Sequence, residues 1–213
     1  MKRYGLRDDQ FARIEHLLPG RPGSVGRTSE VGNRVFVEAV IWKFRSGAPW
    51  RDLLERFGGW KNTHRRFSRS KKDGCDQAIG RSRGGLTTKI HVIVDALGNP
   101  LALSLTGGQT HDITQAETLA AQVKPGALLG DKGYDSDGLI ASLEARSIKV
   151  VIPPKANRKV QRACDFALYA ERNLVERFFN YIKQFRGIAT RYEKTARNFL
   201  AGLHLVCALA WLK

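Results

Sequence analysis

The sequence feature that most limits the fold is an ordered alternation of strand-like and helix-like segments after residue 85. Two β-rich runs, 86–95 and 100–106, are joined by an Ala-Leu-Gly-Asn turn, which is typical of a hairpin with a longer loop. Helical and strand patterns then alternate at residues 112–123, 127–130, 136–145, 149–152 and 169–183. This order predicts an α/β or α+β core in which helices cover a sheet.

The region before this core has a helical pattern and ends in a run of cations. Apolar spacing predicts helices at residues 6–18, 35–44 and 50–57, and Gly58-Gly59 forms a turn after the last of them. No acidic residue interrupts residues 60–72, where Trp60 and Phe67 lie among six cations, Lys61, Arg65, Arg66, Arg69, Lys71 and Lys72. A helix, a glycine turn and a basic helix have the layout of a helix-turn-helix unit.

Two interpretations of this basic segment remain open. In a helix-turn-helix unit the cations would contact DNA phosphates while a few side chains would reach base edges. The alternative is a solvated basic helix that closes a small bundle, which is the usual meaning of a charged run. The tight turn before the run and the basic character of the chain favour DNA contact.

The charge of the whole chain points to a polyanionic partner. The 213 residues contain 36 Lys and Arg against 20 Asp and Glu, which gives a formal net charge of +16. Nucleic acid is the commonest such partner, although a ribosomal or membrane-surface protein would show the same excess. No apolar run approaches the ~20 residues of a membrane span, so we expect no membrane-spanning segment. Three cysteines without a CxxC pair predict no disulfide framework.

Asp131 is the first acidic residue that stands out in the predicted core. It follows the apolar strand at 127–130, and open α/β sheets place their ligands at the carboxyl ends of strands. The alternative role is capping of the next helix, but Asp135 and Asp137 precede that helix directly. We therefore expect Asp131 to be free for another role.

Glu176 is the second such residue, in a predicted helix whose apolar face contains Leu174 and Phe178. Arg172 lies one helical turn before it, so the two side chains share one side of the helix. The pair is either an ordinary surface ion pair or a carboxylate held among cations. With Asp131, Glu176 could bind a hard divalent ion that acts on a phosphodiester.

Several motifs together resemble a known family. They are GRSRGGLTTKIH at 80–91, GDKGYD at 130–135, and Tyr169, Arg172, Glu176 and Lys183 at spacings of three, four and seven, with GAPWRDL at 47–53 and RNFLAGLHL at 197–205. The chain resembles bacterial insertion-sequence transposases of the DDE group with the Y-R-E-K signature, of the IS-five type. The likeness covers nearly the whole chain, and the motifs occur in the expected order.

The resemblance implies a fold and a reaction. The fold is an N-terminal helical, helix-turn-helix-like DNA-binding domain at 1–74 and a ribonuclease-H-like α/β core at 75–213. Asp131 and Glu176 match the second and third acidic residues of a triad that binds Mg²⁺ or Mn²⁺ for DNA cleavage and strand transfer. Tyr134 matches the aromatic position after the second Asp.

The resemblance also implies partners and a location. Tyr169, Arg172 and Lys183 match the remaining signature positions, where cations would contact DNA phosphate. The implied partner is double-stranded DNA with the terminal inverted repeats of the element, bound by a homo-oligomer of the chain. The implied location is the bacterial cytoplasm, in association with the nucleoid.

The chain departs from the family where the first catalytic Asp should be. That residue lies on the first core strand, but residues 68–80 read SRSKKDGCDQAIG and contain no apolar strand. Asp73 and Asp76 lie in a loop sequence, and Asp95 has the position of a hairpin-turn residue. The resemblance therefore predicts an incomplete ribonuclease-H-like core that lacks its central strand, and severely impaired cleavage.

Two functions and three structural outcomes remain open. The chain is either a DNA transposase or a catalytically dead DNA-binding remnant that inhibits transposition. Without the central strand, the backbone groups beside it would lack hydrogen-bond partners. Either the hairpin closes against the strand before Asp131, or a partner chain fills the gap, or the core is only marginally stable. The apolar C-terminal helix would then have less core to cover.

Further cations are weaker candidates for contacts with DNA. Arg81 and Arg83 lie in a glycine-rich stretch that a phosphate backbone can approach closely, although ordinary exposure is nearly as good an explanation. A second basic loop contains Lys155, Arg158, Lys159 and Arg162. His111 and Asp112 could orient a metal ion or a DNA end, but a loop residue and a helix cap explain them better.

Overall fold

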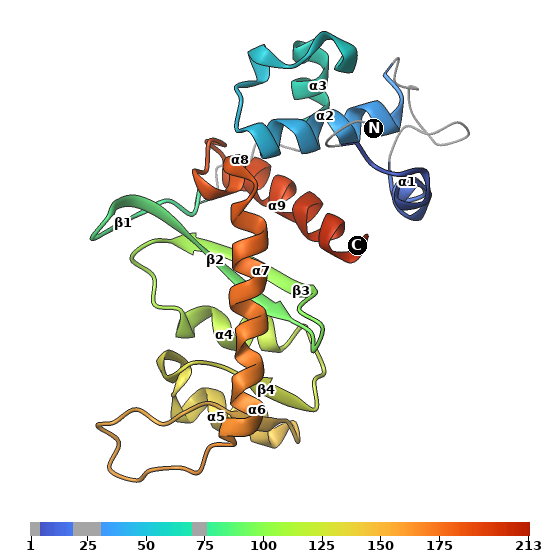
Figure 1. The fold of residues 1–213 in the computed structure, drawn as a ribbon. Helices are drawn as coiled ribbons and strands as arrows, with labels where there is room; N and C mark the ends of the chain where they lie inside the picture. The colour runs from blue at the N-terminus through green and yellow to red at the C-terminus, as the bar shows by residue number, and fades with distance from the viewer. Residues whose placement is uncertain (1–4, 19–30, 70–75) are drawn as a thin grey trace. The chain divides into compact units, whose positions relative to one another are not determined.

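The computed structural model describes residues 5–18, 31–69 and 76–213, which form a mixture of helices and strands (Figure 1). The chain divides into two compact units, a first unit of Met1–Cys75 with Tyr181–Lys213 and a second unit of Asp76–Asn180. The predicted domains also change near residue 75, but they assign residues 181–213 to the second domain rather than the first. The domains at 1–74 and 75–213 come from the resemblance to a family and stay a prediction. The two units are groups of residues that pack together in the structure.

The first unit is helical. Its elements are α1 (Asp8–Glu15), α2 (Asn33–Ser46), the 3-10 turns η1 (Trp50–Asp52) and η2 (Glu55–Phe57), α3 (Trp60–Phe67), α8 (Arg186–Ala189) and α9 (Ala196–Trp211). α2 ends at Gly47, whose φ of 70° is left-handed, a conformation that glycine adopts without steric cost. The single helix predicted at 50–57 is instead two 3-10 turns, because extended backbone at Leu53 brings both Leu53 and Phe57 into one buried cluster.

The packing of α9 explains why the C-terminal residues belong to the first unit. Its apolar residues Leu205, Leu209 and Leu212 pack in one cluster with α2 and α1, and a Cβ on Gly202 would lie 2.0 Å from Phe44 Cζ. The helix therefore packs on the N-terminal helices, whereas we expected it from the sequence in the core of the second domain. Within the described chain, α9 included, no helix is long and apolar enough to cross a membrane.

The second unit contains the strands. Its elements are β1 (Gly80–Ser82), β2 (Gly85–Val94), β3 (Pro100–Gly107), α4 (Ile113–Ala120), β4 (Ala127–Leu129), the 3-10 turn η3 (Lys132–Tyr134), α5 (Asp137–Ala145), β5 (Lys149–Val151), α6 (Phe166–Tyr169) and the 3-10 turn η4 (Ala170–Arg172). The predicted hairpin is confirmed as β2 and β3, which pair antiparallel from Thr88↔Gly107 to Val94↔Pro100. Asp95 closes its turn by accepting hydrogen bonds from the backbone N–H groups of Leu97 and Asn99, each at 2.8 Å.

The strands of the second unit form two separate sheets in the described residues. One is antiparallel with the order β1-β2-β3, and the other is the parallel pair β4-β5, in register from Ala127↔Lys149 to Leu129↔Val151. The hairpin therefore does not close against β4, which removes the first of the three outcomes left open above. A buried cluster that includes Leu139, Leu143 and Ile152 joins α5 to the β4-β5 sheet.

The long helix predicted at 169–183 is divided into three parts. α6 ends at Tyr169, η4 follows, and α7 (Asn173–Lys183) begins after Arg172. The predicted apolar face is confirmed, because Phe178 and Ile182 are buried and Leu174 is half-buried. Arg172 therefore lies in the tighter 3-10 turn and not within a regular α-helix.

Candidate functional site

Asp131 lies directly after β4 and begins η3. Its Oδ1 accepts a hydrogen bond from the backbone N–H of Gly133 at 2.8 Å, so this side chain caps the 3-10 turn. The expectation that Asp131 is free of capping was wrong, because the chain turns immediately after β4 rather than at the next helix. The carboxylate remains exposed to solvent.

Glu176 and Arg172 form the ion pair that their spacing predicted. Arg172 Nη2 donates to Glu176 Oε1, and the guanidinium lies 5.8 Å from the centre of the Tyr169 ring. The bond to Glu176 raises the pKa of Arg172, burial lowers it, and the charge of Asp131 raises it further. Arg172 therefore lies within electrostatic reach of Asp131 and Glu176, which are 45 residues apart in the sequence.

Tyr134 connects this site to the core of the second unit. Burial, and then the charges of Asp112 and Asp131, raise the pKa of Tyr134 to about 12. Asp112 makes no capping bond to α4, although the sequence favoured it as the cap; its carboxylate pairs with Lys89 Nζ at 2.9 Å. This long-range pair left no signal in the sequence, because residues 89 and 112 meet only once the hairpin has formed.

These carboxylates do not form a site for two metal ions. In the part of the chain that the structure describes, no group of three or more His, Cys, Asp or Glu side chains could hold a metal ion. Asp131 is engaged with its own turn, and the Arg172 cation already neutralises Glu176. Because a pair of divalent ions needs several carboxylate oxygens, the residues present do not fit two-metal chemistry.

The basic segment of the first unit contains an exposed row of cations. Lys61 and Arg65 are exposed and lie four residues apart in α3, so they share one face of the helix, and Arg69 is exposed two residues beyond the end of α3. The aromatic anchors face inward, since Phe67 packs on Trp50 with ring centres 5.2 Å apart and Trp60 packs against the cluster of Ala39. The segment is thus held by its aromatic side and presents its cationic side.

Arg66 differs from these three cations. Its guanidinium donates to the Val31 carbonyl at 3.2 Å and to Asn33 Oδ1, and it lies 4.1 Å from the centre of the Phe36 ring. Burial, and then the charge of Arg69, lower its pKa. Arg66 therefore fastens α3 to the start of α2. Lys71 and Lys72 lie outside the described residues.

Arg81 and Arg83 lie at the tip of a short hairpin that the sequence did not predict. β1 pairs with the start of β2, so that Ser82 lies opposite Gly85 and Arg83-Gly84 form the loop. Both arginines are exposed, and a hydrogen bond of 3.0 Å from Thr87 Oγ1 to Ser82 Oγ links the two strands. Lys183 is exposed at the end of α7, in the first unit.

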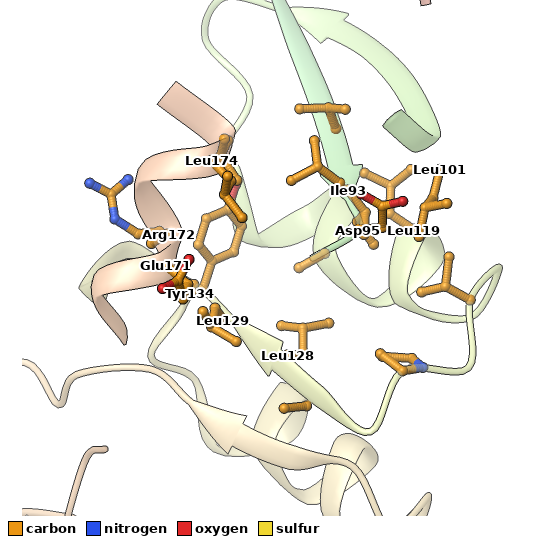
Figure 2. A pocket seen from close by; sticks show the side chains of 18 of the residues that line it. Ile93, Asp95, Leu101, Leu119, Leu128, Leu129, Tyr134, Glu171, Arg172 and Leu174 are labelled. Carbon is orange, nitrogen blue, oxygen red and sulfur yellow. The ribbon is translucent and has the colours of Figure 1, made fainter. Parts of the chain in front are cut away.

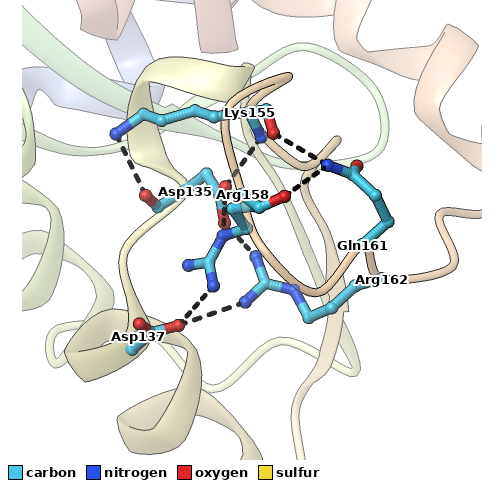
Figure 3. A network of polar contacts seen from close by, with 6 residues as sticks. All are labelled: Asp135, Asp137, Lys155, Arg158, Gln161 and Arg162. Carbon is cyan, nitrogen blue, oxygen red and sulfur yellow. Dashed lines mark hydrogen bonds and ion pairs between the residues drawn. The ribbon is translucent and has the colours of Figure 1, made fainter.

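The second basic loop is held by a buried carboxylate. The fully buried side chain of Asp135 accepts hydrogen bonds from Lys155 N at 2.8 Å, from Arg158 Nε at 2.6 Å and from Arg162 Nη2 (Figure 3). Burial alone would raise the pKa of Asp135, but the bonds from Arg158, Lys155 and Arg162 outweigh it and lower the pKa to about 2. Asp137 bonds the same two arginines. Arg158 and Arg162 therefore hold the loop in place, a role that the sequence did not indicate.

Comparisons with known proteins agree on one family. A family model described as "Transposase DDE domain" matches residues 59–211, and a second, described as "Putative transposase of IS4/5 family", matches residues 6–79. A Brucella ovis protein named "Putative transposase for insertion sequence element IS6501" is 40% identical over 131 residues, which are 60% of this chain and all of the relative.

A second relative covers a similar share of the chain. A Burkholderia cepacia protein named "Putative transposase for insertion sequence element IS402" is 33% identical over 141 residues, 61% of this chain and 64% of the relative. The chain therefore spans a little less than two thirds of that relative's length. No solved structure matches the chain.

Proposed function

The chain belongs to the transposase DDE domain family of insertion sequences, and from that premise we propose that it binds the DNA ends of its own element while cleaving them poorly or not at all. The first unit supplies the binding through a helix-turn-helix-like arrangement of α2, η1, η2 and α3. The second unit is a ribonuclease-H-like core without its first strand, and its catalysis is severely reduced. In the cell, such a protein occupies element ends and inhibits transposition by intact relatives.

The observation that carries the proposal is the exposed row of Lys61, Arg65 and Arg69. Two exposed cations one turn apart on α3, with a third just beyond its end, suit a helix that lies against a phosphate backbone. Two residues hold α3 in place: Phe67 packs on Trp50, and Arg66 bonds to the carbonyl of Val31 just before α2.

The reduced catalysis follows from the carboxylates. Asp131 and Glu176 are the candidate ligands for Mg²⁺ or Mn²⁺, the ions that this family's reaction uses. Asp76 does not supply a third carboxylate from a strand, because its Oδ1 accepts the N–H of Ala78 at 2.9 Å in a local turn. Asp73 lies outside the described residues. Tyr169, Arg172 and Lys183 are proposed to contact DNA phosphate.

The remaining partners follow from the family. Intact relatives would assemble as homo-oligomers on the terminal inverted repeats, and we propose the same arrangement for this chain in the bacterial cytoplasm, near the nucleoid. Arg81 and Arg83 supply a further phosphate contact from the exposed tip of the β1-β2 hairpin. Lys71 and Lys72 extend the basic segment in sequence.

Binding of a labelled duplex with the element's terminal repeat tests the proposal. The Lys61→Ala/Arg65→Ala variant should bind at least about tenfold more weakly than the wild type, with a shallower dependence on salt concentration. The matched control, Arg51→Ala/Lys194→Ala, removes two exposed cations from the same unit and should weaken binding less than about threefold. Equal losses in both variants would contradict a specific role for α3.

A further inference from the structure

The second unit contains an apolar cavity between its two sheets. The cavity has a volume of about 590 Å³ and is bounded by β2, β4, α4 and the helical segment that contains Leu174 (Figure 2). Its wall is mostly aliphatic, with Ile93, Leu119, Leu128, Leu129, Tyr134 and Leu174 among the side chains that form it. Many apolar ligands would fit a cavity of this volume and lining, so its size does not identify the ligand. The backbone around the cavity is more specific.

Two strand edges border this cavity. β2 pairs with β3 along Lys89–Val94, while β1 covers the other edge of β2 at Gly85–Thr87. β4 pairs with β5 on one side, and within the described residues the Lys89–Val94 edge of β2 and the second edge of β4 have no ladder partner. Strand edges present backbone N–H and C=O groups that require partners when they are covered.

The charges at the rim of the cavity are unbalanced. Asp95 and Glu171 lie on different sides of the cavity in Figure 2. The Asp95 carboxylate is bonded to amide groups of its own turn, and in the described chain no cation pairs with Glu171. The other charged residues of the wall are already neutralised, Asp112 by Lys89 and Arg172 by Glu176. The rim is therefore negative in a chain of net charge +16.

We infer that this cavity binds an extended apolar peptide strand with basic residues at its ends, supplied by another polypeptide. The backbone of the peptide pairs with the edges of β2 and β4 and joins the two sheets, which is the β-augmentation mode of peptide recognition. Its apolar side chains fill the cavity, and its end cations meet Asp95 and Glu171. A peptide of about six residues at ~3.3 Å each matches the length of the Lys89–Val94 edge. The inference is independent of DNA binding by the first unit.

Fluorescence anisotropy with a labelled probe peptide tests the inference on the whole protein. The probe has four valines between two lysines, and its first control has the same sequence with alternate backbone amides N-methylated. We expect saturable binding of the probe and at least tenfold weaker binding of the methylated peptide, which cannot complete the ladder. Equal binding of the two would show an apolar pocket that does not pair with backbone, and would overturn the inference.

A matched pair of variants tests the charge argument. Glu171→Gln should weaken binding of the lysine-flanked probe about threefold, whereas Glu144→Gln, an exposed carboxylate on α5 away from the cavity, should leave it unchanged. A glutamate-flanked probe should bind the wild type more weakly than the lysine-flanked one. If the glutamate-flanked probe binds equally well, the proposed occupant is wrong.

Hydrogen exchange gives the position of the peptide. Binding should slow amide exchange at Lys89–Val94 and Ala127–Leu129, and leave α2 and α9 unchanged. If the same amides are already protected without peptide, and sedimentation shows a dimer, the gap is filled by a second copy of the chain and the inference fails. Protection without dimerisation would mean that the two sheets close on each other, which also overturns it.

Discussion

The two units of this chain differ in how closely their cores are packed and in whether their buried charges and strand edges have partners. In the first unit, buried Lys43 pairs with Glu193, Trp50 donates to the same carboxylate at 3.3 Å, and α9 packs closely on Phe44 through Gly202. In the second unit, two small sheets border an apolar cavity, and the edges that face it lack ladder partners among the described residues. The same sequence thus contains one unit with a closed core and one whose core is open.

This difference suggests a physical reason why the proposed DNA binding and cleavage would depend on different parts of the molecule. The proposed binding of DNA by α3 depends on contacts that are local to the first unit, between α3, α2 and Trp50. Metal-dependent cleavage depends on carboxylates brought together by a complete sheet, and the second unit brings together only Asp131 and Glu176 around Arg172. We therefore expect binding and cleavage to separate in this chain.

The largest expected effect is a loss of stability when the buried ion pair of Lys43 and Glu193 in the first unit is broken. Glu193→Gln leaves the Lys43 ammonium, 2% exposed, without its counter-ion, and should lower the free energy of unfolding by about 3–5 kcal/mol. All four tryptophans, at positions 42, 50, 60 and 211, belong to this unit, so tryptophan fluorescence during urea unfolding reports on it.

The double variant Lys43→Met/Glu193→Gln is the control for this prediction. It removes the buried charge but keeps an acceptor for Trp50, so most of the lost stability should return. If the single and double variants are equally unstable, the loss arises from packing and not from the unpaired charge.

The next effect concerns the buried carboxylate of the second unit. Asp135→Asn removes the charge that holds Arg158 and Arg162, and should destabilise this unit by about 2–3 kcal/mol. The released loop around Lys155 should be cleaved faster by trypsin. Asp137→Asn, whose carboxylate is 85% exposed, is the matched control and should cost less than about 1 kcal/mol. Equal trypsin sensitivity in both variants would contradict the assigned role of Asp135.

The low pKa of Asp135 predicts that the second unit loses stability in acid. The pKa of Asp135 is about 2 in the folded chain, below the ordinary ~3.9 of an unfolded Asp, so its contribution to stability is fully present above pH ~4. The contribution is lost as the pH falls from ~4 towards 2. Hydrogen exchange of α5 and β5 should accelerate over this range in the wild type, and the acceleration should be much smaller in Asp135→Asn.

The smallest effect is expected at the candidate site itself. The Glu176 side chain is 60% exposed, so the ion pair with Arg172 is screened by water and Glu176→Ala should change stability by less than ~0.5 kcal/mol. Thermal unfolding that shifts by only a degree or two would make this variant a clean probe of activity. A loss of several degrees would mean that Glu176 has a structural role.

Local patterns predicted much of the fold. The β2-β3 hairpin and the buried face of α7 follow from turn residues and apolar period, which act over a few residues. The 3-10 turns at residues 50–57 were missed because two buried side chains, Leu53 and Phe57, outweigh local helix preference. The short strand β1 was missed because three residues give too little pattern.

The candidate site was less predictable, because its polar contacts join distant parts of the sequence. Spacing alone gave the Arg172–Glu176 pair, but the capping of η3 by Asp131 depends on where the chain turns after β4. The bonds of Arg158 and Arg162 to Asp135 span more than 20 residues, so a basic loop was read as a DNA surface. Charge in a sequence does not reveal which cations are already paired.

One gel assay tests the central claim that binding persists while cleavage is lost. The purified protein is incubated with labelled duplex containing its element's terminal repeat, with Mg²⁺ or Mn²⁺, beside Asp131→Ala and Glu176→Ala. We predict retardation of the duplex by all three proteins and nicking by none. Nicking by the wild type that disappears in both variants would contradict the account, because it would mean that the two carboxylates still form a working site.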